Sequence, residues 1–193
     1  MTTARPDEVL EFWFAASSRK QWWGGGAAFD QEVRERFGET MVAARANELD
    51  TWTVTPDGAL ALVLALDQFP RNIYRNTPDS FSSDAKALAV TRAATSRGDD
   101  RLVVPLERQV FFYLPYQHCE DLATQDVGIA LTERWVASLP EPERAGAEIY
   151  PRFAKKHRDV IEQFGRFPHR NAILGRVSTP EEEAFLREPG SRF

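Results

Sequence analysis

The sequence predicts an all-α protein, and three observations carry this prediction. Apolar residues recur every three or four positions in most segments, which is the spacing of an amphipathic helix. No segment sustains the period-two alternation that a half-buried strand requires. Gly, Pro and acidic residues stand where helix ends are expected. With 193 residues, 42% of them hydrophobic, the chain is long enough for a single all-helical domain over residues 1–193.

The first part of the chain predicts three helices. The first runs from Pro6 to about Ala16 and has acidic residues in its first turn, where the helix dipole favours them. Asp30 is expected to cap the second, which continues to about Leu49. The third runs from Gly58 to Gln68 and is apolar on nearly every side, so we expect it in the middle of the core.

Five more helices are expected in the rest of the chain. They run from Ser83 or Asp84 to about Ser96, from Pro105 to Leu114, from Cys119 or Glu120 to about Ser138, from about Ala145 to Phe164, and from Thr179 through Leu186. Gly98 suits a left-handed C-terminal cap, and Thr179 with Glu182 forms a capping box. Pro151 is expected to delay or kink the fourth of these helices. The expected inward face of that helix consists of Ile149, Phe153, Val160, Ile161 and Phe164.

One motif occurs twice. The first copy is Asp67-Gln68-Phe69-Pro70-Arg71-Asn72, and the second is Gly165-Arg166-Phe167-Pro168-His169-Arg170-Asn171, with one residue inserted after the proline. An arginine follows each copy (Arg75, Arg176), and then a Thr-Pro-acid sequence. Because proline disfavours the helical region for the residue before it, each copy predicts a helix that stops at Phe-Pro, a polar loop, and a new element that starts at Thr-Pro.

Three motifs in order resemble a known bacterial family. They are Leu66-Asp67-Gln68-Phe69-Pro70-Arg71-Asn72, the segment from Tyr113-Leu114-Pro115 to Asp121-Leu122, and Arg166-Phe167-Pro168-His169-Arg170-Asn171. The chain resembles the family catalogued as domain of unknown function 924 over nearly its whole length. The resemblance implies a tetratricopeptide-like fold, in which antiparallel helical pairs form a right-handed superhelical array. It implies no activity, because the family has none established.

The motifs also predict where a site would be. Helices of the same direction in an alternating antiparallel array end on the same side, so the loops at Phe69-Pro70, Leu114-Pro115 and Phe167-Pro168 are expected to converge. The candidate ligand-binding residues are Asp67, Gln68, Arg71, Asn72, Arg75, His157, Arg166, Arg170 and Asn171. The candidate catalytic residues are His118, Glu120, Asp121 and His169.

The duplicated Arg-Asn pairs, Arg71-Asn72 and Arg170-Asn171, have two interpretations. A guanidinium group binds a carboxylate or phosphate through two parallel hydrogen bonds, which predicts a groove for a small anionic ligand or an acidic peptide end. Buried Arg and Asn also satisfy the carbonyl groups that helix ends leave unpaired. The duplication slightly favours the second interpretation, since a shared structural need explains a repeat more simply than two ligands do.

The three histidines all lie in or just before the motif segments. Histidine serves as acid, base or metal ligand near neutral pH. His118 or His169 would be the general base of a hydrolase or lyase, with an acidic neighbour to orient it. No pair of histidines has the spacing that places two ligands on one helix face, so we expect no metal ion and no cofactor. A protein-binding scaffold with an apolar groove is a third alternative, and whether the protein is an enzyme stays open.

Composition and net charge limit the kinds of partner that we expect the protein to bind. The formal net charge of −5 gives no overall basic field, so we expect no nucleic-acid binding. The longest apolar run, Ala59 to Leu66, is far shorter than the roughly 20 residues of a membrane span, and we expect no membrane association. No signal peptide is recognisable, and the one cysteine, Cys119, cannot form an internal disulfide. The expected location is the cytoplasm; the oligomeric state is not predicted.

Overall fold

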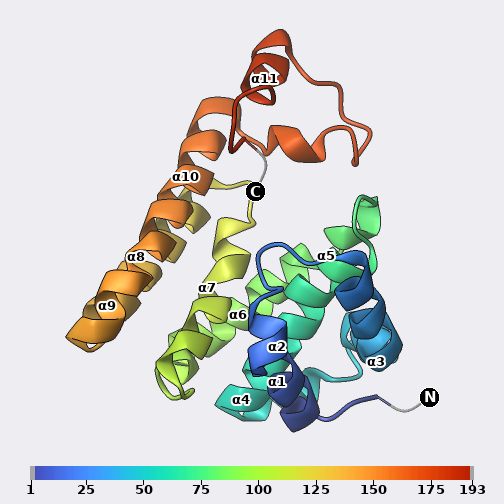
Figure 1. Ribbon diagram of the computed structural model, residues 1–193, viewed down its shortest axis with the longest axis vertical. Helices are drawn as coiled ribbons and strands as arrows, with labels where there is room; N and C mark the ends of the chain where they lie inside the picture. The colour runs from blue at the N-terminus through green and yellow to red at the C-terminus, as the bar shows by residue number, and fades with distance from the viewer. Residues whose placement is uncertain (1–2, 192–193) are drawn as a thin grey trace. The chain divides into compact units, whose positions relative to one another are not determined.

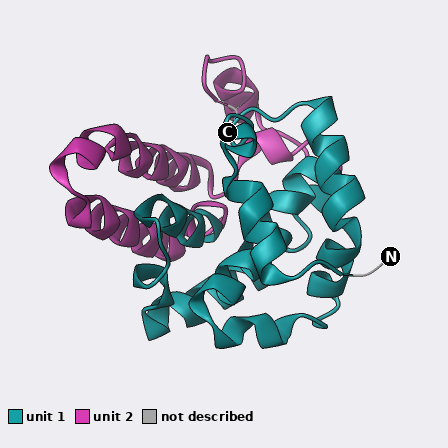
Figure 2. Ribbon diagram, turned by 60° about the horizontal axis from the view of Figure 1, so that its bottom comes forward, with its two compact units in different colours: residues 1–75, 79–115 teal, residues 76–78, 116–193 magenta. Residues whose placement is uncertain are grey.

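The computed structural model describes residues 3–191 and divides the chain into two compact units, each of which is described by itself (Figures 1 and 2). Unit 1 comprises residues 1–75 and 79–115, and unit 2 comprises residues 76–78 and 116–193. Within residues 3–191 the regular secondary structure is entirely helical, which confirms the all-α prediction. The single domain and the tetratricopeptide-like array stay predictions.

The eight predicted helices occur in the predicted order with several boundaries moved, and two short helices, at Ala16–Arg19 and Glu141–Ala147, were not predicted. Unit 1 contains α1 (Pro6–Phe14), α2 (Ala16–Arg19), α3 (Ala27–Arg45), α4 (Pro56–Val63), α5 (Phe69–Ile73), α6 (Asp84–Arg97) and most of α7 (Val110–Gln117). Unit 2 contains α8 (Leu122–Ser138), α9 (Glu141–Ala147), α10 (Ile149–Phe164) and α11 (Pro180–Phe185). Short 3-10 turns occur at Asp50–Val54, Pro78–Ser80, Asp99–Arg101, Leu106–Gln109 and Pro168–Arg170, and a π-helical turn occurs at Leu64–Gln68.

The core of unit 1 surrounds α4, as predicted. Every residue from Ala59 to Leu66 is fully buried, and both α1 and α6 pack against α4. The core continues into an aromatic cluster in which the ring of Phe69 stacks on Phe37 at 4.9 Å between centroids and meets Trp13 at 5.8 Å. Such pairs add about 0.5–1.5 kcal/mol each to the burial of the rings, so Phe69 anchors the first motif copy in the core.

The prediction that the first Phe-Pro ends a helix is wrong. The helix continues from α4 through the π-helical turn into α5, although Pro70 has no N–H group and its ring crowds the carbonyl four residues before it. The wider turn lets the Phe69 N–H bond to the Leu64 carbonyl. The Leu66 carbonyl, which Pro70 cannot satisfy, accepts a hydrogen bond of 2.7 Å from the Ser83 hydroxyl instead.

The two motif copies therefore differ in backbone structure. In the second copy α10 ends at Phe164, and Gly165 follows in the left-handed region with φ of 69°. Gly165 aligns with Asp67, which continues the helix in the first copy. The copies are alike in their Thr-Pro segments, since Pro78 and Pro180 both open helical turns. Pro115 likewise lies inside α7, so the predicted stop at Leu114-Pro115 is also wrong.

Two predicted caps are confirmed and one is wrong. Gly98, with φ of 84°, ends α6, and the capping box of Thr179 and Glu182 opens α11. Asp30 does not cap α3, because that helix begins at Ala27 after Gly26. The Asp30 carboxylate instead accepts hydrogen bonds from Asn72, in the first motif copy, and from Arg75, which follows that copy.

The predicted inward face of α10 is inward only in its C-terminal half. Val160 and Ile161 are buried against Phe167, with Phe164 and Phe185 packed beside them. Ile149 and Phe153 are 47% and 45% exposed, so the prediction that they face inward is wrong. They lie on the same side of the helix as Val160, but the segment with Phe167 and Phe185 covers only the last turns.

Gly58 gives a first testable prediction. A Cβ atom on Gly58 would overlap the backbone carbonyl oxygen of Trp52, whereas a Cβ on Gly38, inside α3, meets no atom within 4 Å. Gly58→Ala is expected to destabilise the protein by about 1–3 kcal/mol, as overpacking does. Gly38→Ala is expected to stabilise it by about 0.5–1 kcal/mol, because alanine favours helix. Urea denaturation of both variants tests the opposite signs, and equal effects would contradict the packing.

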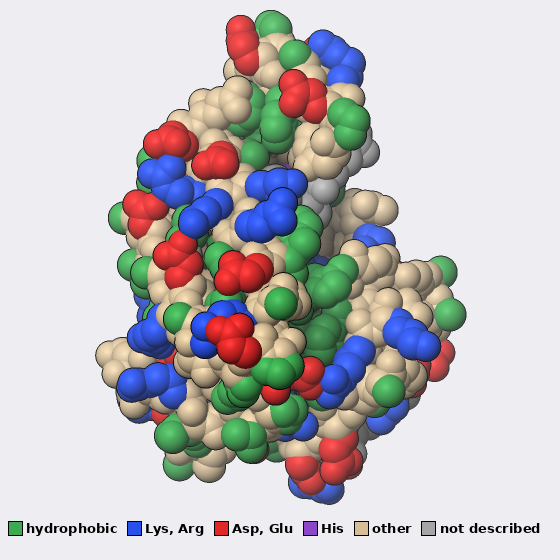
Figure 3. All heavy atoms as spheres, turned by 60° about the vertical axis from the view of Figure 1, so that its left-hand side comes forward, with side chains coloured by type: hydrophobic (Ala, Val, Ile, Leu, Met, Phe, Trp, Pro, Cys, Tyr) green, Lys and Arg blue, Asp and Glu red, His purple; other side chains and the backbone are tan. Residues whose placement is uncertain are grey.

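The surface carries charges of both signs. On the face in Figure 3, basic and acidic side chains are interspersed, and hydrophobic side chains lie between them. Among residues 3–191, no helix combines the length and the apolar character that crossing a membrane requires.

Candidate functional site

In the first motif copy, Arg71 holds two segments of unit 1 together. Its guanidinium group donates two hydrogen bonds to the Asp84 carboxylate, at 2.9 and 3.0 Å, and one of 2.6 Å to the Asp67 carbonyl. It also lies 3.3 Å from the Asp67 carboxylate, which is fully buried and accepts a bond from Gln68. These contacts agree with the structural interpretation of Arg71.

Asp30 is the second anchor of this copy. Its carboxylate accepts a hydrogen bond of 2.8 Å from Asn72 and two from Arg75, at 2.7 and 2.8 Å. Arg75 approaches closely because Gly25, at φ of 58°, has no side chain to collide with the guanidinium group. These donors outweigh the burial that would raise the pKa of Asp30, so this pKa lies below its usual value.

The second copy uses a carboxylate in the same way. Glu182 accepts hydrogen bonds from Arg166 at 2.6 and 2.8 Å and from Asn171 at 3.1 Å. Arg166 also donates to the Val177 carbonyl, and Asn171 donates to the Ser178 hydroxyl. The hydrogen bonds from Arg166 are the main cause that lowers the pKa of Glu182 to about 2. In both copies, therefore, Asn binds a carboxylate that an arginine also holds.

Glu120 and Asp121, the predicted catalytic acids, have partners within unit 2. Glu120 accepts hydrogen bonds from Arg176 at 2.7 and 3.0 Å and from the Phe167 N–H at 2.8 Å. Burial by itself would raise the pKa of Glu120, but the effect of these donors is larger. The pKa of Glu120 therefore lies below its usual value, and the carboxyl group is ionised at neutral pH. Asp121 caps α8 by accepting from the Thr124 N–H.

The three histidines lie close together in unit 2, where His157 and His169 contact the ring of Phe167 and His118 contacts His157. His118 follows α7, His157 lies on α10, and His169 lies in the 3-10 turn Pro168–Arg170. The ring centroids of His118 and His157 are 6.4 Å apart, and those of His157 and His169 are 5.8 and 5.5 Å from Phe167. The guanidinium carbon of Arg170 lies 4.7 Å from the Phe167 centroid. We call His118, His157, His169, Arg170 and Phe167 the histidine cluster.

The residues of the histidine cluster differ in how deeply they are buried. Phe167 is fully buried and Arg170 nearly so, while the three imidazoles are half-buried. His157 Nδ1 lies 2.8 Å from the Phe153 carbonyl oxygen. Burial lowers the pKa of His157 to about 3, and the nearby His118, His169 and Arg170 lower it too, since like charges disfavour protonation. His157 is therefore neutral at physiological pH.

This neutral imidazole predicts a pH dependence of stability. In the unfolded chain His157 has a pKa near 6.5, so the unfolded state binds more protons than the folded state between pH 6.5 and about 3. Stability is expected to fall as the pH drops through this window, by at most about 1.4 kcal/mol per pH unit. Carboxylates with lowered pKa contribute only below about pH 4.5. Urea denaturation between pH 7 and about 4.5 checks the slope, which His157→Gln should flatten; an unchanged slope would contradict the assignment.

The structure places the predicted site residues in both units. Asp67, Gln68, Arg71, Asn72 and Arg75 belong to unit 1, and His118, Glu120, Asp121, His157, Arg166, His169, Arg170 and Asn171 belong to unit 2. Within unit 2, His118, His157, His169 and Arg170 come together, whereas convergence of all three loops stays a prediction. Sequence reasoning missed Asp30, Asp84 and Glu182 as partners of the motif arginines, and Phe167 as the centre of the cluster. Only Glu182 had a local signal, the capping box.

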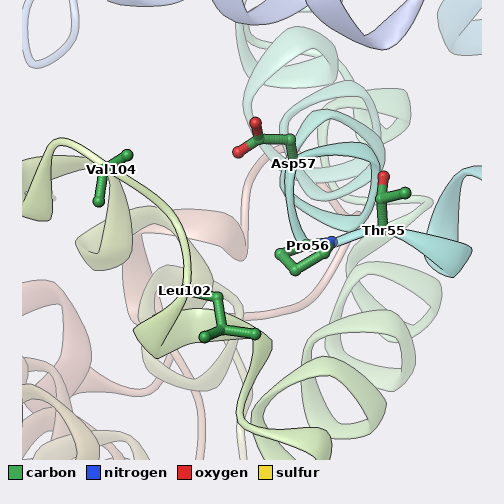
Figure 4. A pocket seen from close by; sticks show the side chains of 5 residues that line it. All are labelled: Thr55, Pro56, Asp57, Leu102 and Val104. Atoms are coloured by element: carbon green, nitrogen blue, oxygen red, sulfur yellow. The ribbon is translucent and has the colours of Figure 1, made fainter.

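Other features of the described residues bear on the site. Unit 1 has a surface hollow of about 390 Å³ at the start of α4, lined by Thr55, Pro56, Asp57, Leu102 and Val104 (Figure 4). Of these lining residues only Asp57 is ionisable, and none is a predicted site residue. Within residues 3–191, no group of three or more His, Cys, Asp or Glu side chains is arranged to hold a metal ion.

Comparison with known proteins identifies the family. The family described as "Bacterial protein of unknown function (DUF924)" matches residues 9–190. A solved structure of a protein of unknown function from Agrobacterium tumefaciens is 38% identical, with a TM-score of 0.84 over 94% of this chain and 96% of that chain. None of the curated proteins compared with the chain matches it. The chain therefore belongs to the DUF924 family of bacterial proteins of unknown function.

Proposed function

We propose that the protein binds a small oxyanion, a phosphate or a carboxylate, at the histidine cluster. The observation that carries the proposal is the gathering of His157, His169 and Arg170 around the buried ring of Phe167, with His118 beside His157. Arg170 is cationic and the imidazoles of His118 and His169 can accept a proton, so an anion among these groups interacts favourably with them. Glu120, the acid bonded to the Phe167 N–H, pairs with Arg176 and also interacts electrostatically with Arg170, so an anion at the cluster would share Arg170 with Glu120.

The same proposal assigns the other motif arginines to structure. Arg71, Arg75 and Arg166 each make two hydrogen bonds to a carboxylate of their own unit. An external anion would have to displace that carboxylate, at the cost of leaving it without its partner. The proposed anion site therefore includes fewer of the motif arginines than the groove that the sequence predicts. The tetratricopeptide-like array and the cytoplasmic location remain part of the proposal and rest on the family resemblance and on composition.

The second candidate function is a hydrolase or lyase with His118 or His169 as the general base. Histidines far apart would have counted against it, and their proximity is the observation that favours it. An anion anchored by Arg170 would bring its reacting atoms beside an imidazole, as general-base catalysis requires. Anion binding comes first in either function, so it is tested first. For the scaffold alternative, no observation names a partner.

Titration with inorganic phosphate tests the proposal. Imidazole signals in two-dimensional ¹H–¹⁵N NMR spectra are expected to shift saturably as phosphate is added. Arg170→Gln should weaken binding about 10–100-fold, the value of a hydrogen bond to a charged group. His118→Gln, at a half-buried position, serves as a second variant, with thermal melting to verify that both are folded.

The matched control is Arg158→Gln. Arg158 follows His157 on α10 but pairs with Asp126 and Glu162, so its loss should leave phosphate binding unchanged. Absence of any saturable shift in the wild-type protein would overturn the anion site. Equal weakening by Arg170→Gln and Arg158→Gln would reduce it to nonspecific attraction.

A further inference from the structure

The hollow at the start of α4 gathers exposed apolar side chains of unit 1. Among residues 3–191, five large hydrophobic side chains are at least 60% exposed. Two of them, Leu102 at 67% and Val104 at 68%, line this hollow, and a third, Val54 at 83%, directly precedes the lining residue Thr55. Exposed apolar side chains that are scattered singly need no explanation, whereas a group of them marks a binding surface. The hollow therefore has the apolar walls of a ligand site.

These apolar walls are held in place by the core beneath them. Leu102 and Val104 flank Val103, whose side chain is only 1% exposed and whose carbonyl accepts a hydrogen bond from Gln109. Because Val103 is anchored in the core, its two neighbours stay at the surface. Figure 4 shows the Pro56 ring and the Asp57 carboxylate turned from α4 toward the segment that carries Leu102 and Val104.

The charge in the hollow comes from Asp57. Its side chain is exposed, and within residues 3–191 its carboxylate has no ion-pair partner. The nearest cations of the facing segment are engaged elsewhere, since Arg97 pairs with Asp99 and the Arg101 guanidinium group lies beside Gly98. The hollow thus combines apolar walls with one negative charge that the described part of unit 1 does not neutralise.

The dipole of α4 reduces this negative charge without cancelling it. A helix N-terminus carries about half of a positive elementary charge, whereas an ionised carboxylate carries a full negative one. The Thr55 hydroxyl already caps α4 by accepting a hydrogen bond of 3.1 Å from the Gly58 N–H. Asp57 is therefore not needed as the cap of this helix, and its carboxylate is available to a ligand.

We propose that this hollow binds a small molecule in which an ammonium group is joined to an apolar body. The ammonium group pairs with the Asp57 carboxylate, and the apolar body covers Pro56, Leu102 and Val104. The volume of about 390 Å³ lies within the range of small-molecule sites, about 300–1,000 Å³. A neutral ligand of the same shape lacks the ion pair, and an anion is repelled. This site belongs to unit 1 and does not depend on the anion site proposed for unit 2.

Three ligands with the same phenyl group test the proposal at neutral pH. They are 2-phenylethylamine, 2-phenylethanol and 3-phenylpropanoate, which carry a positive, no and a negative charge. In ¹H–¹³C NMR spectra the methyl signals of Leu102 and Val104 are expected to shift saturably with the amine. The alcohol should bind about five-fold more weakly, the value of an exposed ion pair, and the carboxylate more weakly still. Ethylamine, which lacks the apolar body, should bind more weakly than 2-phenylethylamine.

Variants connect this preference to the hollow. Asp57→Asn should bring the affinities for the amine and the alcohol together, and Leu102→Ser should weaken both. The control is Glu48→Gln, which removes one exposed negative charge that does not line the hollow and should keep the preference. Absence of a saturable shift with the amine overturns the site. Equal binding of amine and alcohol by the wild-type protein, or a preference that survives Asp57→Asn, overturns the assigned ligand class.

Discussion

Arg71→Ala is expected to lower the free energy of unfolding by about 3–5 kcal/mol, the cost of breaking a buried charge pair. Asp67 is fully buried, and Asp84 is only 17% exposed, so neither carboxylate can recover full hydration when the guanidinium group is removed. The Asp67 carbonyl also loses its donor. Denaturation with urea at pH 7 measures the loss.

A second substitution separates electrostatics from packing. If the loss comes from a buried charge without its counterion, Asp67→Asn in the Arg71→Ala background should restore part of the stability. Arg36→Ala is the control, because Arg36 and Glu32 have the same four-residue spacing but are both about half exposed. Its cost should be at most about 1 kcal/mol. If Arg71→Ala and Arg36→Ala lower the free energy of unfolding by similar amounts, Arg71 does not stabilise the protein through its buried ion pairs.

Local sequence signals predicted the helices well because helix ends are decided within a few residues. The end of α6 at Gly98 and the start of α11 at Thr179 each depend on residues within one turn. The continuation of the helix through Pro70 could not be predicted in this way. It depends on the Leu66 carbonyl, which accepts a hydrogen bond from the Ser83 hydroxyl, 17 residues after Leu66 in the chain. A local rule about proline has no access to that partner.

In the candidate site, too, the sequence identified single residues but not the contacts between residues that lie far apart in the chain. The sequence identified His118, His157 and His169 individually, from their positions in or just before the motif segments, but the contacts of His157 and His169 with Phe167, and of His118 with His157, depend on how unit 2 folds. The partners of Arg75 and Arg176 are Asp30 and Glu120, which lie 45 and 56 residues away. No spacing in the sequence identifies such pairs. The repeat itself is therefore informative about scaffold, and the histidines, which it does not duplicate, are the better indication of function.

Glu182→Ala is expected to cost about 3–5 kcal/mol, because one buried carboxylate serves four donors. Arg166 donates twice, and Asn171 and the Thr179 N–H donate once each, to a side chain that is 3% exposed. Removing the carboxylate leaves these donors facing one another in the loop that follows the histidine cluster. Urea denaturation measures the change, and Glu183→Ala, the exposed neighbour in α11, should cost about 0.5 kcal/mol or less.

The pH dependence of this effect follows from the lowered pKa of Glu182. Its folded pKa of about 2 lies below the unfolded value near 4.5, so the carboxylate contributes its full stability above pH 4.5 and loses it as the pH falls toward 2. The difference in stability between wild type and Glu182→Ala should therefore be constant from pH 7 to about 5 and shrink below about 4.5. Glu182→Gln keeps the shape of the side chain and should lie between the two. A difference that does not change with pH would mean that Glu182 stabilises the protein through packing and not through the charge of its carboxylate.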